Sequence, residues 1–458
     1  MPATSPPEAE TAPETEAAQR PHREEVRFAV VLNGGVSLAV WMGGVVHEID
    51  AVTQGYADDE RTPDHAYGRL MTALGLRARA DVITGTSAGG INGAALALSQ
   101  VNQSADLLTL RDLWAQQGRM ETLLQRPFTG QPSSLLRGEE YFLPKLGEAM
   151  SRLSREWTPR KDRPVDLTIT ATLLSGALAT TTDSMGQVLP QLRHDGRFRF
   201  RRGFKQVAPQ VVDGQQRYTE VEHDDFDGTD EMASRLGLSA RCSAGFPVAF
   251  EPSFVPVGRP GVGRPDMGRF ANWATFDRAS DATPETGSRD LSRYAVDGGV
   301  LSNTPTREAL DAIQQLGAKE PVQRVMLLVF PHAPATLADP PSDPHAPPTL
   351  PGSLGAMLAA LRADGGRTHV DKIEEHNRRA ACRRDTREDL LGEAELSTLA
   401  GQLYRSYSKL RVQRAARDLP DRIDLPPSWS FERARQACLQ AKSCTSDRST
   451  RSPTCPRS

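Results

Sequence analysis

The fold is decided by the stretch Asp81-Val82-Ile83-Thr84-Gly85-Thr86-Ser87-Ala88-Gly89-Gly90, where an apolar run enters a turn of small residues. The residues up to Thr84 have β character, and the run from Ile91 to Ser99 is typical of a helix. The sequence therefore predicts a strand, a sharp turn and a helix, which is the local setting that a nucleophile elbow needs.

Ser87 is the candidate nucleophile of this turn. Gly85 and Gly89 flank it, and glycine tolerates the strained dihedrals and close backbone approach of a sharp turn. The N–H groups of the first helical residues, Ala88 among them, carry partial positive charge and would face the oxyanion of an acyl-transfer intermediate. The alternative is an ordinary strand-to-helix turn that contains a serine. The apolar strand before Ser87 and the glycines and alanines after it favour the elbow.

A second glycine-rich turn, Asn33-Gly34-Gly35-Val36-Ser37, lies between a predicted buried strand, Arg27–Leu32, and an apolar helical run, Leu38–Ile49. Such a turn presents backbone N–H groups to an anion. Its spacing fits neither the dinucleotide fingerprint nor a Walker loop. We expect the Ser87 turn to supply the nucleophile and this turn to supply oxyanion donors.

A third turn follows a short predicted strand that delivers Asp297 into Gly298-Gly299. Thr304 and Pro305 are then predicted to be the N-cap and first residue of the next helix. Further strands are predicted at Asp166–Leu173 and Gln323–Phe330, because these segments are rich in β-branched and apolar residues.

Strands alternate with helices, which predicts an α/β fold with a mainly parallel sheet. In such sheets, ligands bind at the carboxyl ends of the strands. The turns that contain Gly34, Ser87 and Asp297 all follow strands, so we expect them to meet at that edge.

Composition narrows the class of protein. The 458 residues carry 55 Lys and Arg against 58 Asp and Glu, a balance that does not point to nucleic acid. The five cysteines are scattered, without a C-x-x-C pair, so we expect a reducing, cytoplasmic compartment and neither a metal nor a cofactor. No stretch reaches eighteen consecutive apolar residues, so no spanning helix is expected.

Together the three turns resemble those of the patatin-like phospholipases, in particular the bacterial patatin-related proteins. That family has a glycine-rich oxyanion loop, a G-x-S-x-G elbow and an Asp-Gly-Gly turn in this order. Here these are Asn33–Ser37, Gly85–Gly89 and Asp297–Gly299, and Asn303 and Pro305 also fit the pattern after the third turn.

The resemblance implies a three-layer patatin-like fold and a carboxylic ester hydrolase that acts through a Ser87–Asp297 dyad. It also implies oxyanion donors at Gly34, Gly35 and Val36 and a fatty-acyl ester substrate of the phospholipid or lysophospholipid class. The chain departs from the family pattern in the oxyanion loop. Asn33 stands where the family has its first glycine, and Ser37 where it has a basic residue.

Two other readings stay open. A Ser87–Asp297–His332 triad would have the chain order of an α/β-hydrolase, with His47 as a less suitable histidine. A catalytically decayed lipid-binding or scaffold protein is the other alternative, suggested by Ser37. Retention of Ser87, Asp297 and both flanking glycine turns argues against decay.

The resemblance covers residues 26–335, which we predict to be the hydrolase domain. We predict a disordered N-terminal segment at 1–25, a proline-rich linker at 336–352, a helical, arginine-rich region at 353–440 and a disordered tail at 441–458. The sequence does not predict the oligomeric state.

Arg197-Phe198-Arg199-Phe200-Arg201 alternates with a period of two, which predicts a strand with phenylalanines on one face. The arginines are typical of an edge strand that charge protects from aggregation. The alternative is a basic rim for anionic lipid headgroups and a peripheral membrane contact. The acidic segment Glu220–Asp230 is predicted to be a surface loop.

Overall fold

The computed structural model describes residues 24–35, 39–54, 66–125, 133–160, 163–182, 187–212, 215–258, 263–276, 290–316, 322–330 and 366–393, with the single residues 185, 349 and 353. The chain divides into two compact units, Met1–Ile373 and Glu374–Ser458. The described part of the second unit belongs to one helix, and every residue of the candidate site that is described lies in the first.

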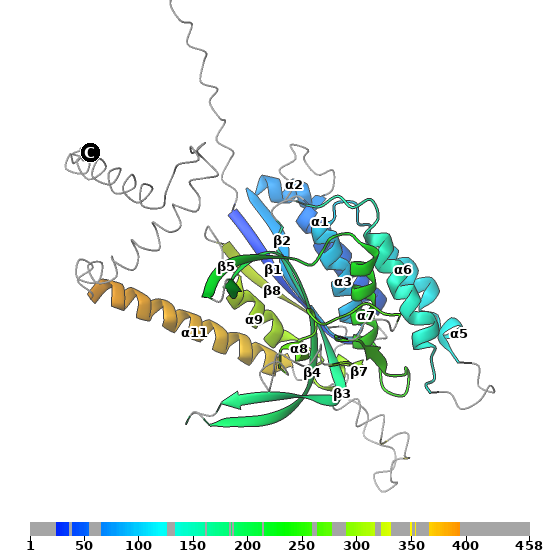
Figure 1. The fold of residues 1–458 in the computed structure, drawn as a ribbon. Coiled ribbons are helices and arrows are strands. Elements are labelled where there is room, and N and C mark those ends of the chain that lie inside the picture. Colours follow the sequence, from blue (N-terminus) through cyan, green and yellow to red (C-terminus); the bar gives the residue numbers. More distant parts are fainter. Residues whose placement is uncertain are drawn as a thin grey trace, which may run out of the picture. The chain divides into compact units, whose positions relative to one another are not determined.

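The first unit is built on an eight-stranded sheet with the order β5-β4-β3-β2-β1-β8, to which β7 adds beside β3 and β6 beside β7 (Figure 1). The bounds of the strands are β1 Glu24–Leu32, β2 Leu76–Gly85, β3 Val165–Thr182, β4 Val188–Val212, β5 Gln215–Asp224, β6 Ser253–Val255, β7 Arg293–Asp297 and β8 Val322–Val329.

The centre of this sheet is parallel, because β1 pairs in parallel with β2 and β8, and β2 with β3. Antiparallel pairs extend it beyond β3, through β4 and β5 on one path and β7 and β6 on the other. The predicted α/β class with a mainly parallel centre is confirmed. The carboxyl ends of β1, β2 and β8 lie at one edge of the sheet, as the parallel register requires.

Helices cover both faces of the sheet. The described α-helices of the whole chain are α1 Ala39–Gln54, α2 Ala66–Ala73, α3 Ala88–Val101, α4 Leu108–Asp112, α5 Met120–Leu123, α6 Leu143–Leu153, α7 Asp230–Ser243, α8 Trp273–Phe276, α9 Thr306–Gln315 and α11 Gly366–Glu393. In Figure 1, α1, α3, α6 and α7 lie on one side of the sheet and α9 lies on the other.

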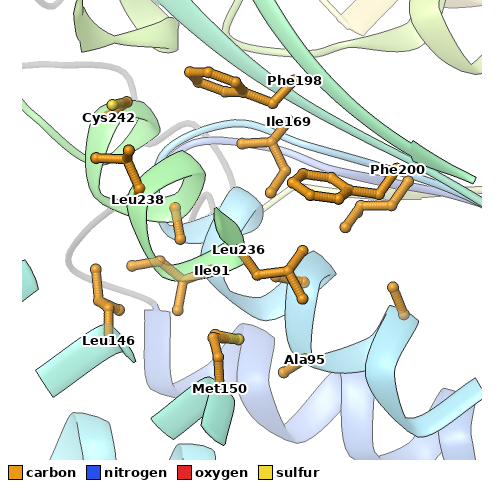
Figure 2. Packing of buried hydrophobic residues seen from close by; sticks show 14 of the residues in the cluster. Ile91, Ala95, Leu146, Met150, Ile169, Phe198, Phe200, Leu236, Leu238 and Cys242 are labelled. Carbon is orange, nitrogen blue, oxygen red and sulfur yellow. The ribbon is translucent and has the colours of Figure 1, made fainter. Parts of the chain in front are cut away.

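The main core lies between the sheet and the helices α3, α6 and α7. Figure 2 shows apolar side chains of α3 and α7 facing Ile169, Phe198 and Phe200 of the sheet, and Leu146 and Met150 of α6 on the far side of those two helices. All the residues of α3 are buried, which explains why its sequence is made of small and apolar residues. A smaller cluster on the other face joins Ala309 and Ala312 of α9 to the sheet. In the described part of the chain, no helix is both long and apolar enough to cross a bilayer.

The alternation at Arg197–Arg201 is confirmed, but its assignment to an edge strand is wrong. Phe198 and Phe200 are fully buried. One side of this segment pairs with β3, and on the other side its backbone bonds to Phe270 and Asn272. The partners come from a distant loop, so sequence alternation alone does not show that the second side is covered.

The arginines of this segment have protein partners. Arg197 pairs with Asp195 and Glu308, and Arg199 pairs with the buried Asp166. The alternative interpretation of these arginines as a rim for lipid headgroups therefore has no support at Arg197 and Arg199, whose charges are matched within the fold.

Two predicted boundaries also change. The first strand begins at Glu24, two residues before the predicted start of order at Val26. The predicted acidic loop is wrong at its beginning, because Glu220–Asp224 belongs to β5. The predicted boundaries of the domain, linker and tails stay predictions, and residues 336–348 and 394–458 lie outside the described residues.

Candidate active site

The strand, sharp turn and helix predicted around Ser87 are present as β2, the Ser87 turn and α3. Ser87 has φ 55° and ψ −125°, a left-handed backbone that is rare for a residue with a side chain. A Cβ on Gly85 would collide with the carbonyl group of Gly89, and one on Gly89 would collide with the carbonyl group of Leu32. Both glycines of the G-x-S-x-G motif are thus required by the close packing of this turn.

Ser87 and Asp297 meet directly. The Ser87 hydroxyl donates to Asp297 Oδ2 over 2.7 Å, and both residues are fully buried. Asp297 is the last residue of β7, and its register beside Ala171 of β3 brings it to the elbow. The backbone N–H of Gly299 donates to the other carboxylate oxygen over 2.7 Å, so the Asp-Gly-Gly turn orients the carboxylate.

The backbone of Ser87 is held by a residue that the sequence did not indicate. The Ser87 N–H donates to the hydroxyl of Ser243 over 2.8 Å, at the end of α7. This bond links the elbow to a helix that lies far away in sequence. The small-residue run Ser239–Gly245 was the only available signal, and it does not single out this serine.

The first glycine-rich turn lies against the elbow. A Cβ on Gly34 would collide with Asn303 Oδ1 and would come within 3.3 Å of the Ser87 Cβ. The Gly34 N–H donates to the carbonyl of Asn303 over 3.1 Å, so in this structure Gly34 shapes the loop and its amide is engaged. Gly35 is also described, whereas Val36 and Ser37 lie outside the described residues.

Asn33, which departs from the family's glycine, has a structural role. Its side-chain oxygen accepts a 2.7 Å hydrogen bond from the hydroxyl of Thr304, and both residues are buried. The predicted N-cap at Thr304 is wrong, because the helix α9 begins after Pro305 and has no side-chain cap. The hydroxyl that was expected to cap α9 instead ties the segment after Asp297 to the end of β1.

Two threonine side chains bond the elbow to the segment that follows Asp297. The Thr86 hydroxyl lies 2.6 Å from that of Thr170 on β3 and donates to the carbonyl of Ser302 over 3.0 Å. Thr84 donates to the carbonyl of Pro305 over 3.1 Å. A Cβ on Gly298 would collide with the backbone of Thr170. The turns at Ser87 and Asp297 are therefore held in one rigid arrangement.

The histidines of the alternative triad are not part of this arrangement as far as it is described. His47 is exposed on α1, and His332 lies outside the described residues. Within the described residues there is no cluster of three or more His, Cys, Asp and Glu side chains that would hold a metal ion.

The fold agrees with the comparisons with known proteins. The patatin-like phospholipase family matches residues 30–310, which include the first glycine-rich turn, the elbow and Asp297. A protein of Mycobacterium tuberculosis, named uncharacterized membrane protein Rv3479, is 30% identical over 94% of this chain and 38% of its own length. The chain thus spans less than half the length of that relative. On the family match and the fold that carries it, the chain belongs to the patatin-like phospholipases, a family of lipid acyl hydrolases.

Proposed function

We propose that the chain is a serine acyl hydrolase that cleaves fatty-acyl esters of phospholipids or lysophospholipids, with Ser87 as nucleophile and Asp297 as base. The direct 2.7 Å hydrogen bond between the two buried side chains supports this proposal most strongly. A candidate base must lie within hydrogen-bond reach of the proton that it removes, and Asp297 meets that condition.

In the proposed reaction, Ser87 Oγ attacks the ester carbonyl carbon and its proton passes to Asp297 Oδ2. The tetrahedral intermediate collapses, the bond to the alcohol oxygen breaks, and Asp297 returns the proton to the leaving alcohol. Water then attacks the acyl-enzyme while Asp297 takes one of its protons, and the fatty acid leaves as Ser87 is reprotonated. The N–H of Gly299 holds Oδ1, which leaves Oδ2 directed at Ser87 throughout.

The oxyanion that forms on the carbonyl oxygen needs backbone donors aimed at it. The N–H of Ser87 is bonded to Ser243 and that of Gly34 to Asn303. We therefore assign the donor role to Ala88 at the start of α3 and to Gly35, with Val36 as the further donor that the family pattern predicts. Gly34 contributes by its lack of a side chain, which lets the loop approach Ser87.

The geometry also bears on the two alternatives. A triad places a histidine between serine and carboxylate, whereas here the two side chains bond directly. Decay of the site is disfavoured by the strained backbone of Ser87, which costs about 1–3 kcal/mol and persists where the surroundings enforce it.

Product analysis tests the proposal. We expect the purified chain to release free fatty acid and a lysophospholipid, or fatty acid and a glycerophosphodiester, from phospholipid micelles, as measured by mass spectrometry. The Ser87→Ala variant is expected to release none. Ser99→Ala is the matched control, since it removes a buried hydroxyl of α3, the helix that follows Ser87, and this hydroxyl is bonded to the Leu96 carbonyl. Fatty-acid release by folded Ser87→Ala at the rate of Ser99→Ala would overturn the proposal.

A further inference from the structure

The strands β3 and β4 continue past the candidate site as a two-stranded hairpin, which we call the arm; its described residues are 174–182, 185 and 187–192. β3 pairs with Asp297 of β7 at Ala171, and from Ala177 to Thr182 it pairs with residues 188–193 of β4. Figure 1 shows this hairpin extending away from the sheet beyond β7. Because β3 runs parallel to β2, the arm leaves the sheet at the same edge as the Ser87 elbow.

The arm exposes apolar side chains. Leu192 is 64% exposed and Met185, near the tip, 91% exposed. The other large apolar side chains that the arm exposes are Leu174, Leu178, Val188 and Leu189. Leu178 lies opposite Leu192 in the register, and alternation along β4 puts Val188 on the same face. Between residues 174 and 192 the sequence has one charged residue, Asp183. Contiguous exposed apolar surface of this kind marks an interaction site.

The base of the arm is cationic. A cavity of about 660 Å³ lies there, lined by Arg193, Arg197, Arg307 and Lys372 and by the carboxylates of Asp195 and Glu308. The carboxylates pair with Arg193 and Arg197. Arg307 is 74% exposed and lies 4.0 Å from Asp311, and Lys372 forms no ion pair with the described residues. The two exposed cations therefore remain available to an anion from outside.

We propose that the arm docks the protein on a bilayer that contains anionic phospholipid. Its apolar face and tip would enter the interface, and Arg307 and Lys372 at its base would meet headgroup phosphates, to which basic side chains near a membrane surface are attracted. A second copy of the chain is a poorer partner for the arm, because a dimer would bring the positively charged residues at the base of each arm close together.

The dimensions of the arm set the depth of docking. The paired segment from Ala177 to Thr182 rises about 17 Å at about 3.3 Å per residue, well short of the hydrocarbon thickness of about 30 Å. A two-stranded hairpin also leaves backbone groups unpaired along its outer edges, and these are costly in hydrocarbon. The arm is thus suited to one leaflet, at the depth of the headgroups and first methylenes.

Vesicle co-sedimentation of full-length Ser87→Ala protein tests this, since lipid hydrolysis is then removed and docking is measured alone. Phosphatidylcholine vesicles are compared with and without phosphatidylglycerol. Val188→Asp combined with Leu192→Asp is expected to lower the partition coefficient by about tenfold or more. The matched control is Leu70→Asp combined with Leu74→Asp at α2, where two exposed leucines lie at the amino end of β2. It is expected to bind like the parent.

The role of Arg307 and Lys372 is tested separately, by comparing binding to anionic and neutral vesicles. Arg307→Gln combined with Lys372→Gln is expected to weaken binding to the anionic vesicles and to leave binding to pure phosphatidylcholine unchanged, and added salt should reduce the difference. As a check that keeps the arm apolar, Met185→Trp is expected to show more fluorescence quenching by brominated lipids than the parent, which has five tryptophans of its own.

Equal binding by the arm variant and the α2 control, or no added quenching in Met185→Trp, would overturn the proposal. The same holds if light scattering shows that the parent is a dimer that the arm variant dissociates while vesicle binding is unchanged, because the arm would then join two copies. None of these outcomes depends on Ser87, so failure of the docking proposal leaves the proposed hydrolase activity standing.

Discussion

Ser87 and Asp297 are brought into contact by two turns whose residues have little freedom. Asp297 receives one N–H on the oxygen that faces away from Ser87, which leaves the second oxygen at 2.7 Å from the hydroxyl. Burial removes water as a competing acceptor. At the scale of residues, this contact supports the proposal that Asp297 takes the serine proton without a histidine.

The first prediction separates the dyad from the triad. Asp297→Asn keeps the shape but removes the proton acceptor, so turnover of a short-chain acyl ester should fall about 10²–10⁴-fold, the usual loss of a general base. His332→Ala should retain nearly the parent rate. Steady-state kinetics of both variants, with folding checked by circular dichroism, measure the contrast. A folded His332→Ala protein without activity would replace the dyad by a triad.

A second prediction concerns Cys242, which lies beside Ser243 in α7. Burial raises the pKa of its thiol to about 12. At pH 8 iodoacetamide should therefore modify the exposed Cys382 in the native protein and leave Cys242 unmodified until the chain unfolds. An unfolded thiol ionises near pH 8.5, so between about pH 9 and 12 the native state holds the extra proton and stability should fall as pH rises. Peptide mapping of the alkylated protein checks the first result; early modification of Cys242 would contradict it.

At the scale of elements, charged side chains join three strands of the parallel centre. Asp81 on β2 is fully buried, accepts two hydrogen bonds from Arg324 on β8 at 2.7 and 2.9 Å, and lies 3.7 Å from Arg27 on β1. Removing one partner of a buried pair leaves the other charge uncompensated. The charged cluster of Asp81, Arg27 and Arg324 therefore stabilises the pairing of β1 with β2 and β8.

The third prediction follows from that group. Asp81→Ala should lower the free energy of unfolding by about 3–5 kcal/mol. Asp311→Ala is the control, because its 4.0 Å pair with Arg307 is exposed and such pairs contribute about 0–1 kcal/mol. Urea unfolding measures both. Similar losses in the two variants would show that the buried group adds no more than a surface pair.

The sequence predicted those parts of the site that are local. The Ser87 and Asp297 turns each lie within one strand-and-turn unit, so glycine spacing and apolar runs were enough to find them. Ser243 and the bond from Thr304 to Asn33 were missed, because each contact joins segments far apart in sequence. The arm was missed for a similar reason, since alternation in β3 and β4 does not show where a strand leaves its sheet.

At the scale of the whole molecule, the candidate active site and the proposed membrane-docking arm lie at the same edge of the sheet. The elbow, the Asp297 turn and the arm all lie there, and Ser87 itself is fully buried. The cytoplasmic location and the C-terminal boundaries stay predictions. The mycobacterial relative aligns with 94% of this chain at 30% identity but is much longer, so the activity of that whole protein is a separate question.

Covalent labelling by a fluorophosphonate tests the central claim most directly, because the reagent reacts only with an activated serine. One adduct is expected, located by fragment ions at Ser87 within the tryptic peptide of residues 80–111. Loss of the adduct in Ser87→Ala and its retention in Ser99→Ala are expected as well. An adduct of equal yield in folded Ser87→Ala protein, or none in the folded parent, would contradict the claim that Ser87 is an activated nucleophile.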